Sequence, residues 1–269
     1  MVADALSAAG PGPSSGGPGE IRALRHGRTR VLLRHLGTPI AIGVVLGVLY
    51  LWVHGLRLDS IERRTLNYTY MHDRVIEHVK LTVVATVIVI AIAIPLGVLV
   101  SRPKARWISP VVLGLSNLGQ AIPSLGLLVL LTIKFGVGFK IAMFGLVVYA
   151  VLPVLRNTMV GIQQVDPALV EAARGMGMTR RQVLFSVELR LAVPVILAGL
   201  RTALVLTVGV ATLATFVNAG GLGDMIVNGI KLSRHPVLIT GSVLTCCIAF
   251  LVDWLGNLAE DLLRPRGLS

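Results

Sequence analysis

The chain has 269 residues, of which 54% are hydrophobic and only 14% are charged, and its mean hydropathy is +0.81. Soluble domains carry about a quarter charged residues, so this composition excludes an ordinary soluble protein and indicates a membrane protein. The net charge of +12 does not point to nucleic acid, because Lys and Arg concentrate in segments that flank apolar stretches on one predicted side.

The N-terminal residues 1–36 begin with a stretch rich in Gly, Pro, Ser and Ala and continue with five arginines. This composition cannot bury enough apolar surface to fold, so it predicts a disordered, basic N-terminus. A signal peptide is excluded, because no positive segment leads directly into an apolar core. Residues 37–76 are expected to form an additional N-terminal transmembrane helix followed by an external loop.

Apolar segments long enough to cross a membrane follow along the chain. A span needs about 20 mostly apolar residues. We therefore predict an all-α fold, a polytopic membrane bundle of about six transmembrane helices. The excess of Lys and Arg on one side places both termini in the cytoplasm, including the short tail 263–269. The six predicted spans are at about 38–54, 77–100, 108–132, 139–160, 191–217 and 237–256.

Between the fourth and fifth predicted spans lies a polar segment, residues 165–190, that carries helix start and stop signals. Asp166 is a good N-cap residue and Pro167 suits the first helical position. Gly175 and Gly177 both offer positions at which this helix can end, because glycine tolerates the left-handed conformation. Thr179 and Gln182 fit a capping box for a second helix. The segment therefore predicts two short helices with a bend between them.

The first of these helices is expected to present one face to a neighbour. Leu169, Ala172, Ala173 and Met176 fall near one face at three-to-four spacing, and Glu171 stands beside them as an exposed charge. The pattern alone leaves two interpretations open. The segment is either a docking element for a cytoplasmic partner or an amphipathic loop on the lipid surface.

This segment resembles the EAA motif of the membrane subunits of bacterial ABC importers. The motif is carried by Glu171, Ala172, Ala173 and Gly177, followed by Val187 and Leu189 at the family's spacing. Arg190 stands where the family has proline, and Val187 stands where it usually has isoleucine. The segments 120–131, 135–162 and 199–226 and the region of Asp253 are similar to permease subunits of osmoprotectant importers, which handle glycine betaine, choline and carnitine.

The resemblance implies a type I ABC importer permease core over residues 77–262, working by alternating access. It implies three partners, which are cytoplasmic ABC ATPase subunits, an external substrate-binding protein, and a second permease copy or a sister permease, all in or at the lipid bilayer. It assigns contact with the ATPase to the coupling segment 165–190, through Leu169, Glu171, Ala172, Ala173, Met176 and Gly177.

The chain itself lacks the signatures of an enzyme. A nucleotide-binding P-loop requires G-x-x-x-x-G-K-[ST], and the nearest match, NGIKLS at 228–233, lacks the lysine after its glycine. We therefore expect no cofactor in this chain, with ATP and magnesium held by the partner ATPase. No metal-ligand spacing occurs either, because the two cysteines, Cys246 and Cys247, are adjacent and are interpreted as packing residues.

Two alternatives to an osmoprotectant permease stay open from the sequence. The first is an ABC importer permease for another small solute, such as an amino acid or a phosphonate. The second is an ion-coupled secondary carrier, which would need ionisable residues within the membrane. Only Arg201 and Asp253 qualify, and the long docking segment would have no use in such a carrier.

Polar residues within the predicted spans are candidates for the solute pathway. Asn117, Gln120 and Ser124 recur at three-to-four spacing in the third span, and Thr207 and Thr212 lie in the fifth. Such residues either line a path or form hydrogen bonds between helices, and the sequence does not decide between the two. Pro123 can break the third span beside them.

After the fifth span, the stretch NAGGLGDMI at 218–226 contains three closely spaced glycines. Glycine permits a sharp turn or a close approach of backbones. The family resemblance implies an external gate or a contact with the binding protein here, formed by Asn218, Gly220, Gly221 and Gly223. The alternative is a plain flexible loop.

Overall fold

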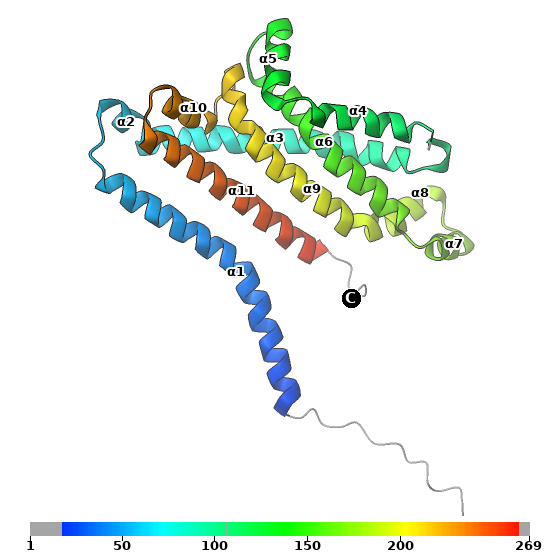
Figure 1. Cartoon of the computed structure of the whole chain (residues 1–269). Helices are drawn as coiled ribbons and strands as arrows, with labels where there is room; N and C mark the ends of the chain where they lie inside the picture. Colours follow the sequence, from blue (N-terminus) through cyan, green and yellow to red (C-terminus); the bar gives the residue numbers. More distant parts are fainter. Residues whose placement is uncertain (1–17, 106, 264–269) are drawn as a thin grey trace, which may run out of the picture.

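A computed structural model of the chain describes residues 18–105 and 107–263, with side chains from residue 36 onward (Figure 1). Every regular element in these ranges is helical, which confirms the all-α prediction. Predictions for residues 1–17 and for the tail beyond residue 263 lie outside the described part of the chain. The elements are α1 Pro18–Gly55, α2 Ser60–Thr65, α3 Tyr68–Val100, η1 Pro103–Ala105, α4 Ser109–Ala121, α5 Ser124–Phe135, α6 Phe139–Gln163, α7 Pro167–Gly175, α8 Arg180–Val183, η2 Leu184–Glu188, α9 Leu189–Ala211, η3 Thr212–Val217, α10 Gly223–Lys231 and α11 His235–Leu263.

The first helix is longer than the sequence predicts. α1 begins at Pro18, so the prediction of disorder is wrong for residues 18–36. Proline is favoured in the first helical turn, and the arginines, leucines and alanines that follow are good helix formers. The loop after α1 is also more ordered than expected. It contains α2, which Asp59 caps through a capping box with Glu62, and α3 begins at Tyr68, nine residues before the predicted start.

Five stretches are long and apolar enough to cross a membrane, namely residues 36–55, α3, α6, residues 180–217 and α11. The predicted third span is instead a pair of helices, α4 and α5, bent by 95°. Ile122 and Pro123 are extended at the bend, and proline has no N–H to continue the helix. The break predicted at Pro123 is therefore confirmed, and the stretch 108–132 is not one continuous helix.

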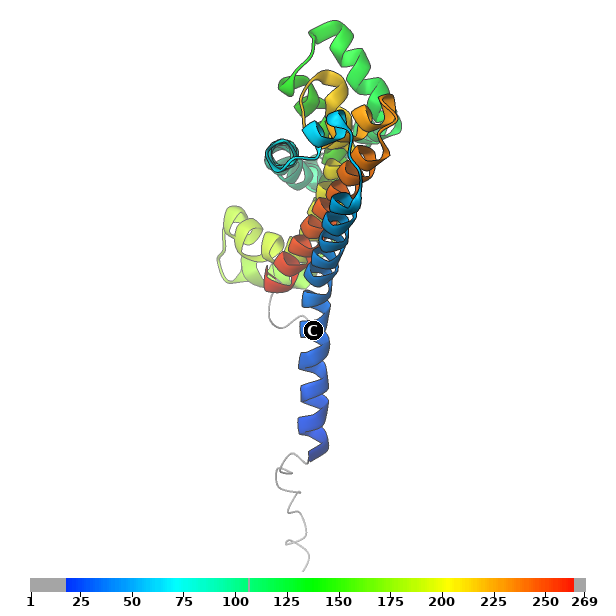
Figure 2. The same cartoon turned by 90° about the vertical axis from the view of Figure 1, so that its left-hand side faces the viewer.

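The bent pair connects opposite ends of the bundle. α4 follows η1 at the end that carries α7, whereas the residues after α5 lie at the end that carries α10, where the Gly138 N–H donates to the Val217 carbonyl at 2.6 Å. Figures 1 and 2 show α7 and α8 at one end and α2 and α10 at the other. These are called the α7 end and the α10 end below. Counted as one broken span, the pair brings the total to the six predicted.

The centre of the bundle is α6, which packs between α3 and α9. Its buried residues Val154 and Leu155 meet Val89 of α3 and Ala203 of α9. Glycines allow the backbones to approach closely, as is common between membrane helices. A Cβ atom at Gly199 would lie only 2.7 Å from the Pro153 carbonyl oxygen.

Large apolar side chains are also exposed along the outside of the helices, for example Val83 and Val87 on α3 and Phe250 on α11. Apolar residues on the outer surface of a bundle suit contact with lipid or with another membrane subunit. α1 contributes to this surface by running alongside α11, with which it encloses a small apolar groove.

Candidate functional site

The α7 end is formed around a short, well-capped helix. The Asp166 carboxylate accepts a hydrogen bond from the Ala168 N–H at 2.8 Å, and Pro167 occupies the first helical position. Gly177 ends the helix with a left-handed φ of +83°. Its N–H donates to the Arg174 carbonyl at 2.9 Å, and the next N–H, of Met178, reaches the Ala173 carbonyl at 3.2 Å. This is the Schellman pattern, so the helix predicted from the caps is confirmed.

The second predicted helix begins as expected but does not stand alone. Thr179 and Gln182 form the capping box, with the Thr179 N–H donating to the Gln182 carboxamide oxygen at 2.8 Å. From there α8 continues through one π-helical turn, η2, directly into α9. Residues 180–217 are therefore one continuous span, and the prediction of a separate short helix is wrong in this respect. The bend at residues 176–179 connects α7 to this span along the chain, and α7 also packs against α8 and η2.

The outward face of α7 is narrower than the sequence predicts. Leu169 and Met176 are 48% and 76% exposed, and Glu171 and Ala172 are exposed as well. Ala173 is only 2% exposed, because each helical residue is rotated by about 100° from the last and Ala173 therefore turns toward the body of the protein. Its placement on the same face as Ala172 is wrong. Glu171 has no ion-pair partner among the described residues.

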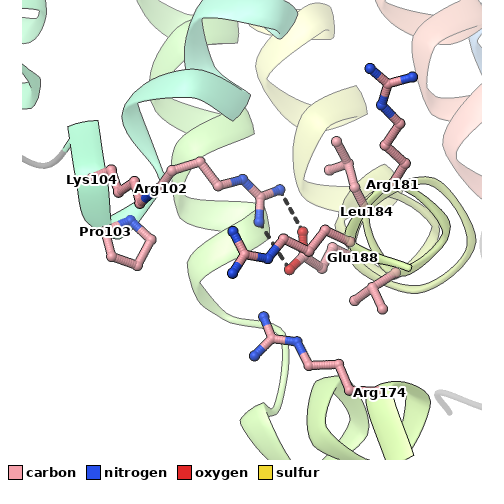
Figure 3. Close-up of a pocket in the computed structure, with 9 residues that line it drawn as sticks. Arg102, Pro103, Lys104, Arg174, Arg181, Leu184 and Glu188 are labelled. Atoms are coloured by element: carbon pink, nitrogen blue, oxygen red, sulfur yellow. Dashed lines mark hydrogen bonds and ion pairs between the residues drawn. The ribbon is translucent and has the colours of Figure 1, made fainter. Parts of the chain in front are cut away.

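A partly buried ion pair joins two elements at this end of the bundle. Arg102, just beyond α3, donates to both carboxylate oxygens of Glu188 in η2, at 3.1 and 2.5 Å (Figure 3). The Glu188 side chain is only 9% exposed. Two parallel bonds between a guanidinium and a carboxylate fix orientation as well as distance. The contact ties the end of α3 to the helix that follows the α7 bend.

At the α10 end, the glycine-rich stretch makes a tight turn between η3 and α10. Asn218, Gly220 and Gly221 all have positive φ values, of 55°, 78° and 92°. A Cβ atom at Gly220 would clash with the Glu77 carboxylate, and one at Gly223 would clash with the Thr212 backbone. The sharp turn predicted from these glycines is confirmed, and its backbone is ordered by contacts rather than being a plain loop.

This turn is held to the start of α3 by a cluster of charges that we call the clasp, comprising Arg74, Glu77 and Asp224. Arg74 donates to Asp224 at 2.6 Å and to Glu77 at 2.8 Å. Glu77 also accepts the Gly221 N–H at 2.9 Å, and the Thr215 hydroxyl donates to Asp224. The clasp therefore joins α3, η3 and α10 at this end of the molecule.

The predicted pathway residues do not form one surface. Asn117 is exposed on α4, but the Gln120 amide donates to the Tyr149 carbonyl of α6 at 2.8 Å and so links two helices. Ser124 begins α5, beyond the 95° bend, so it does not continue the face of Asn117 and Gln120. The shared face predicted for these three residues is therefore wrong.

The two threonines of the predicted pathway differ from each other. Thr207 is 1% exposed, and its hydroxyl donates to the Ala203 carbonyl in its own helix at 2.7 Å. It therefore packs inside the bundle, and its assignment to the pathway stays a prediction. Thr212 is half-buried at the start of η3 and bonds the Gly209 carbonyl at 2.7 Å.

The two ionisable residues that the sequence places within the spans are paired with each other. Arg201 of α9 donates from Nη2 to the Asp253 carboxylate of α11 at 2.9 Å, and also from Nε to that carboxylate and from Nη1 to Asn257. A charged side chain inside a membrane is costly unless it is paired and hydrogen-bonded, as these two residues are, so their arrangement fits a structural role. The arrangement offers no unpaired carboxylate for ion coupling at this position.

The sequence does not identify the three charged residues of the clasp, Arg74, Glu77 and Asp224, as candidate site residues. The only local signal is the spacing of Arg74 and Glu77, which are three residues apart on one helix and form an ion pair at 2.8 Å. Asp224 is 150 residues from Arg74, and no sequence pattern connects the two.

Residues 93–266 match the family described as the inner membrane component of binding-protein-dependent transport systems. The chain belongs to this family. The match begins within α3, so α1 and α2 lie outside it. Because the family consists of membrane components of transport systems, membership places this chain in the membrane with multiple spans, and it agrees with a transport subunit rather than an enzyme.

Similar members of this family have names that specify their transport systems. The carnitine transport permease protein OpuCD of Listeria monocytogenes is 40% identical over 202 residues, which cover 74% of this chain and 89% of that protein. The osmoprotectant import permease protein OsmW of Salmonella typhimurium is 38% identical over 78% of this chain and 100% of that protein. The choline transport system permease protein OpuBB of Bacillus subtilis is 39% identical over 72% of this chain and 88% of that protein.

Solved structures of ABC transporters share the fold. The MetNI methionine ABC transporter, in an inward-facing conformation, aligns with a TM-score of 0.64 and 25% identity over 72% of this chain and 96% of that chain. An amino acid ABC transporter solved with histidines aligns with a TM-score of 0.61 and 20% identity over 77% of this chain and all of that chain. The latter likeness shows the fold alone.

Proposed function

We propose that this chain is the permease subunit of an ATP-driven importer that moves quaternary-amine osmoprotectants, such as glycine betaine, choline or carnitine, into the cell. The observation that carries the proposal is the agreement among relatives at 38–40% identity, whose names specify carnitine, osmoprotectant and choline transport. The structurally similar methionine transporter, which would favour an amino acid, is only 25% identical. The osmoprotectant class is therefore preferred over the amino acid class.

The motor of this importer is a separate ATPase, which carries ATP and magnesium. Its docking point is α7, because that helix is capped at both ends and presents Leu169, Ala172 and Met176 outward beside the unpaired Glu171. Exposed apolar side chains around one charge suit a protein partner. Closure of the ATPase pair moves α7, and the continuous helix 180–217 carries that motion across the membrane.

This assignment places the α7 end in the cytoplasm and the α10 end outside. The basic residues Arg174, Arg180, Arg181 and Arg190 then lie on the cytoplasmic side, as the positive-inside rule favours. The turn at residues 218–223 and the clasp face the external binding protein and form the outer gate. A second permease, identical or related, completes the pathway, and the two-state cycle is alternating access biased by ATP.

Uptake in cells tests this function. Cells that lack the chain are compared with the same cells after its restoration, using labelled glycine betaine, and unlabelled choline, carnitine and methionine as competitors. The expected result is ATP-dependent uptake that returns with the chain and is competed by choline or carnitine but not by methionine. Competition by methionine alone, or no restored uptake of glycine betaine by a membrane-inserted chain, contradicts the osmoprotectant assignment.

A further inference from the structure

A basic pocket of about 470 Å³ lies at the α7 end, between η1 and the segment from α7 to η2 (Figure 3). We propose that it binds the phosphate headgroup of an acidic membrane lipid. This site goes beyond the transported solute and does not depend on which solute that is. The charged side chains that line it are Arg102, Lys104, Arg174, Arg180, Arg181 and Glu188.

The net positive charge of this basic pocket favours the binding of an anion. Glu188, its single carboxylate, is fully engaged by both terminal nitrogens of Arg102, so this pair contributes little net charge. The other four basic side chains have no carboxylate partner among the described residues. Like charges that line a concave surface reinforce one another and raise the local concentration of anions. Arginine forks in particular match the oxygens of a phosphate group.

The position of the pocket along the membrane normal matches that of lipid headgroups. Arg102 follows the last residue of α3, Val100, by two positions, and Lys104 lies in η1 directly after it. On the other side of the pocket, Arg180 and Arg181 begin the continuous membrane helix that ends at Val217. The residues on both sides of the pocket therefore lie where a span leaves the hydrocarbon region of the membrane. The phosphate groups of lipids lie at the same depth.

Apolar side chains beside the basic pocket favour a lipid over an acidic protein segment. Val183 and Leu184 line the pocket next to the basic residues. Phe185, the following residue, is 65% exposed, and Trp107, three residues after Lys104, is 76% exposed. Exposed aromatic residues at this depth are typical of the membrane interface, where they contact lipid. A headgroup in the pocket would leave its acyl chains against such residues.

The bound lipid would join two parts of the protein that are far apart in the sequence, η1 and α7. Figure 3 shows Arg174 extending from α7 and Lys104 standing on η1, with the Arg102–Glu188 pair between them. A phosphate that contacts both sides would hold α7 against the end of α3. The outward face of α7, with Leu169 and Met176, stays free for the ATPase.

Binding of short-chain phosphatidylglycerol to the purified full chain in detergent tests the proposal. The variant Lys104→Gln/Arg181→Gln removes two charges of the pocket, and Arg156→Gln/Arg190→Gln removes two exposed charges outside it. Each basic residue near an anionic lipid contributes about fivefold in affinity, so we expect the Kd of the pocket variant to rise about thirtyfold. The control variant should bind like the unmodified chain.

Two further arms separate the possible anions. Dioctanoyl phosphatidylcholine and millimolar inorganic phosphate should neither bind comparably nor displace phosphatidylglycerol. Equal binding of phosphatidylcholine, or displacement by inorganic phosphate, overturns the assignment to an acidic lipid. The assignment is equally overturned if the pocket variant keeps its affinity for phosphatidylglycerol but no longer copurifies with the ATPase, since the pocket would then serve the protein partner.

Discussion

At the scale of single residues, the clasp is the group of charges that joins α3, η3 and α10 at the α10 end. Arg74 is shared by two carboxylates, those of Glu77 and Asp224, at 2.8 and 2.6 Å. Its side chain is 21% exposed, so water replaces its contacts only in part. Removing this single cation leaves two neighbouring carboxylates that repel each other, whereas removing one carboxylate leaves a neutral pair.

This asymmetry predicts that Arg74→Gln is more destabilising than Asp224→Asn. We expect a loss of about 1–3 kcal/mol in the free energy of unfolding for Arg74→Gln, the usual range for breaking hydrogen bonds to charged groups. Thermal unfolding of the full chain in detergent measures the difference. Arg57→Gln is the matched control, because Arg57 is exposed in the loop after α1. A stability of Arg74→Gln equal to that of the control would show that the clasp contributes nothing.

The sequence predicts the turn of the clasp but not its charges. Gly220 and Gly221 allow the turn to be predicted, because glycine readily adopts a left-handed φ and leaves room for a close neighbour. Nothing in the sequence around Arg74 or Asp224 distinguishes them from other charged residues. Their ion pair forms only because the fold brings α3 and α10 together at this point. The ion pair of Arg201 and Asp253 is easier to predict than the clasp, because a charged residue within a membrane span needs a partner of opposite charge.

At the scale of elements, α7 has two faces that differ in burial. Ala172 is exposed and Ala173 is buried, although they are adjacent and have the same side chain. The first borders Leu169 and Met176 on the outer face, and the second packs against the protein. Two substitutions of the same kind should therefore have opposite consequences.

Ala173→Leu should destabilise the protein by about 1–3 kcal/mol, because extra methylene groups overpack a buried site. Ala172→Leu should leave thermal stability unchanged but weaken the association with the ATPase at least tenfold, because the added side chain obstructs a close contact. Thermal unfolding and copurification with the ATPase measure the two effects. The same outcome for both variants would refute the assignment of the faces.

Local signals explain which parts of this element could be predicted. Caps are formed by residues within four positions, so Asp166, Gly177 and Thr179 mark the ends of the helices correctly. The rotation of α7 about its axis is set by distant packing, and the sequence therefore places Ala173 on the wrong face. The continuity of α8 with α9 was also hidden, because a capping box marks where a helix starts but not how far it continues.

At the scale of the whole molecule, the membrane topology depends on whether α4 and α5 together form one crossing. The hydrogen bond between Gly138 and Val217 places the end of α5 at the α10 end, opposite η1. Hydropathy alone predicts the crossing, since residues 108–132 are mostly apolar and carry no charged residue. It does not predict the 95° bend, which requires that Pro123 be accommodated by neighbouring helices.

Site-directed labelling tests this topology. In a chain with both native cysteines replaced by alanine, Lys104→Cys and Val137→Cys lie before and after the bent pair, at exposed positions. We expect a membrane-impermeant maleimide to label Val137→Cys in intact cells, and Lys104→Cys only after permeabilisation. Labelling of both from the same side would mean that α4 and α5 form a re-entrant loop.

In the proposed function, transport depends on α7 transmitting the conformational change of an ATPase to the membrane helices. The most direct measurement is ATP-driven accumulation of glycine betaine in proteoliposomes that contain the chain with its ATPase and binding protein. For Glu171→Ala we predict at least a tenfold loss of accumulation with unchanged thermal stability, while Asp73→Ala, an exposed carboxylate at the α10 end, accumulates normally. Accumulation by Glu171→Ala at the rate of the unmodified chain would contradict coupling through this helix.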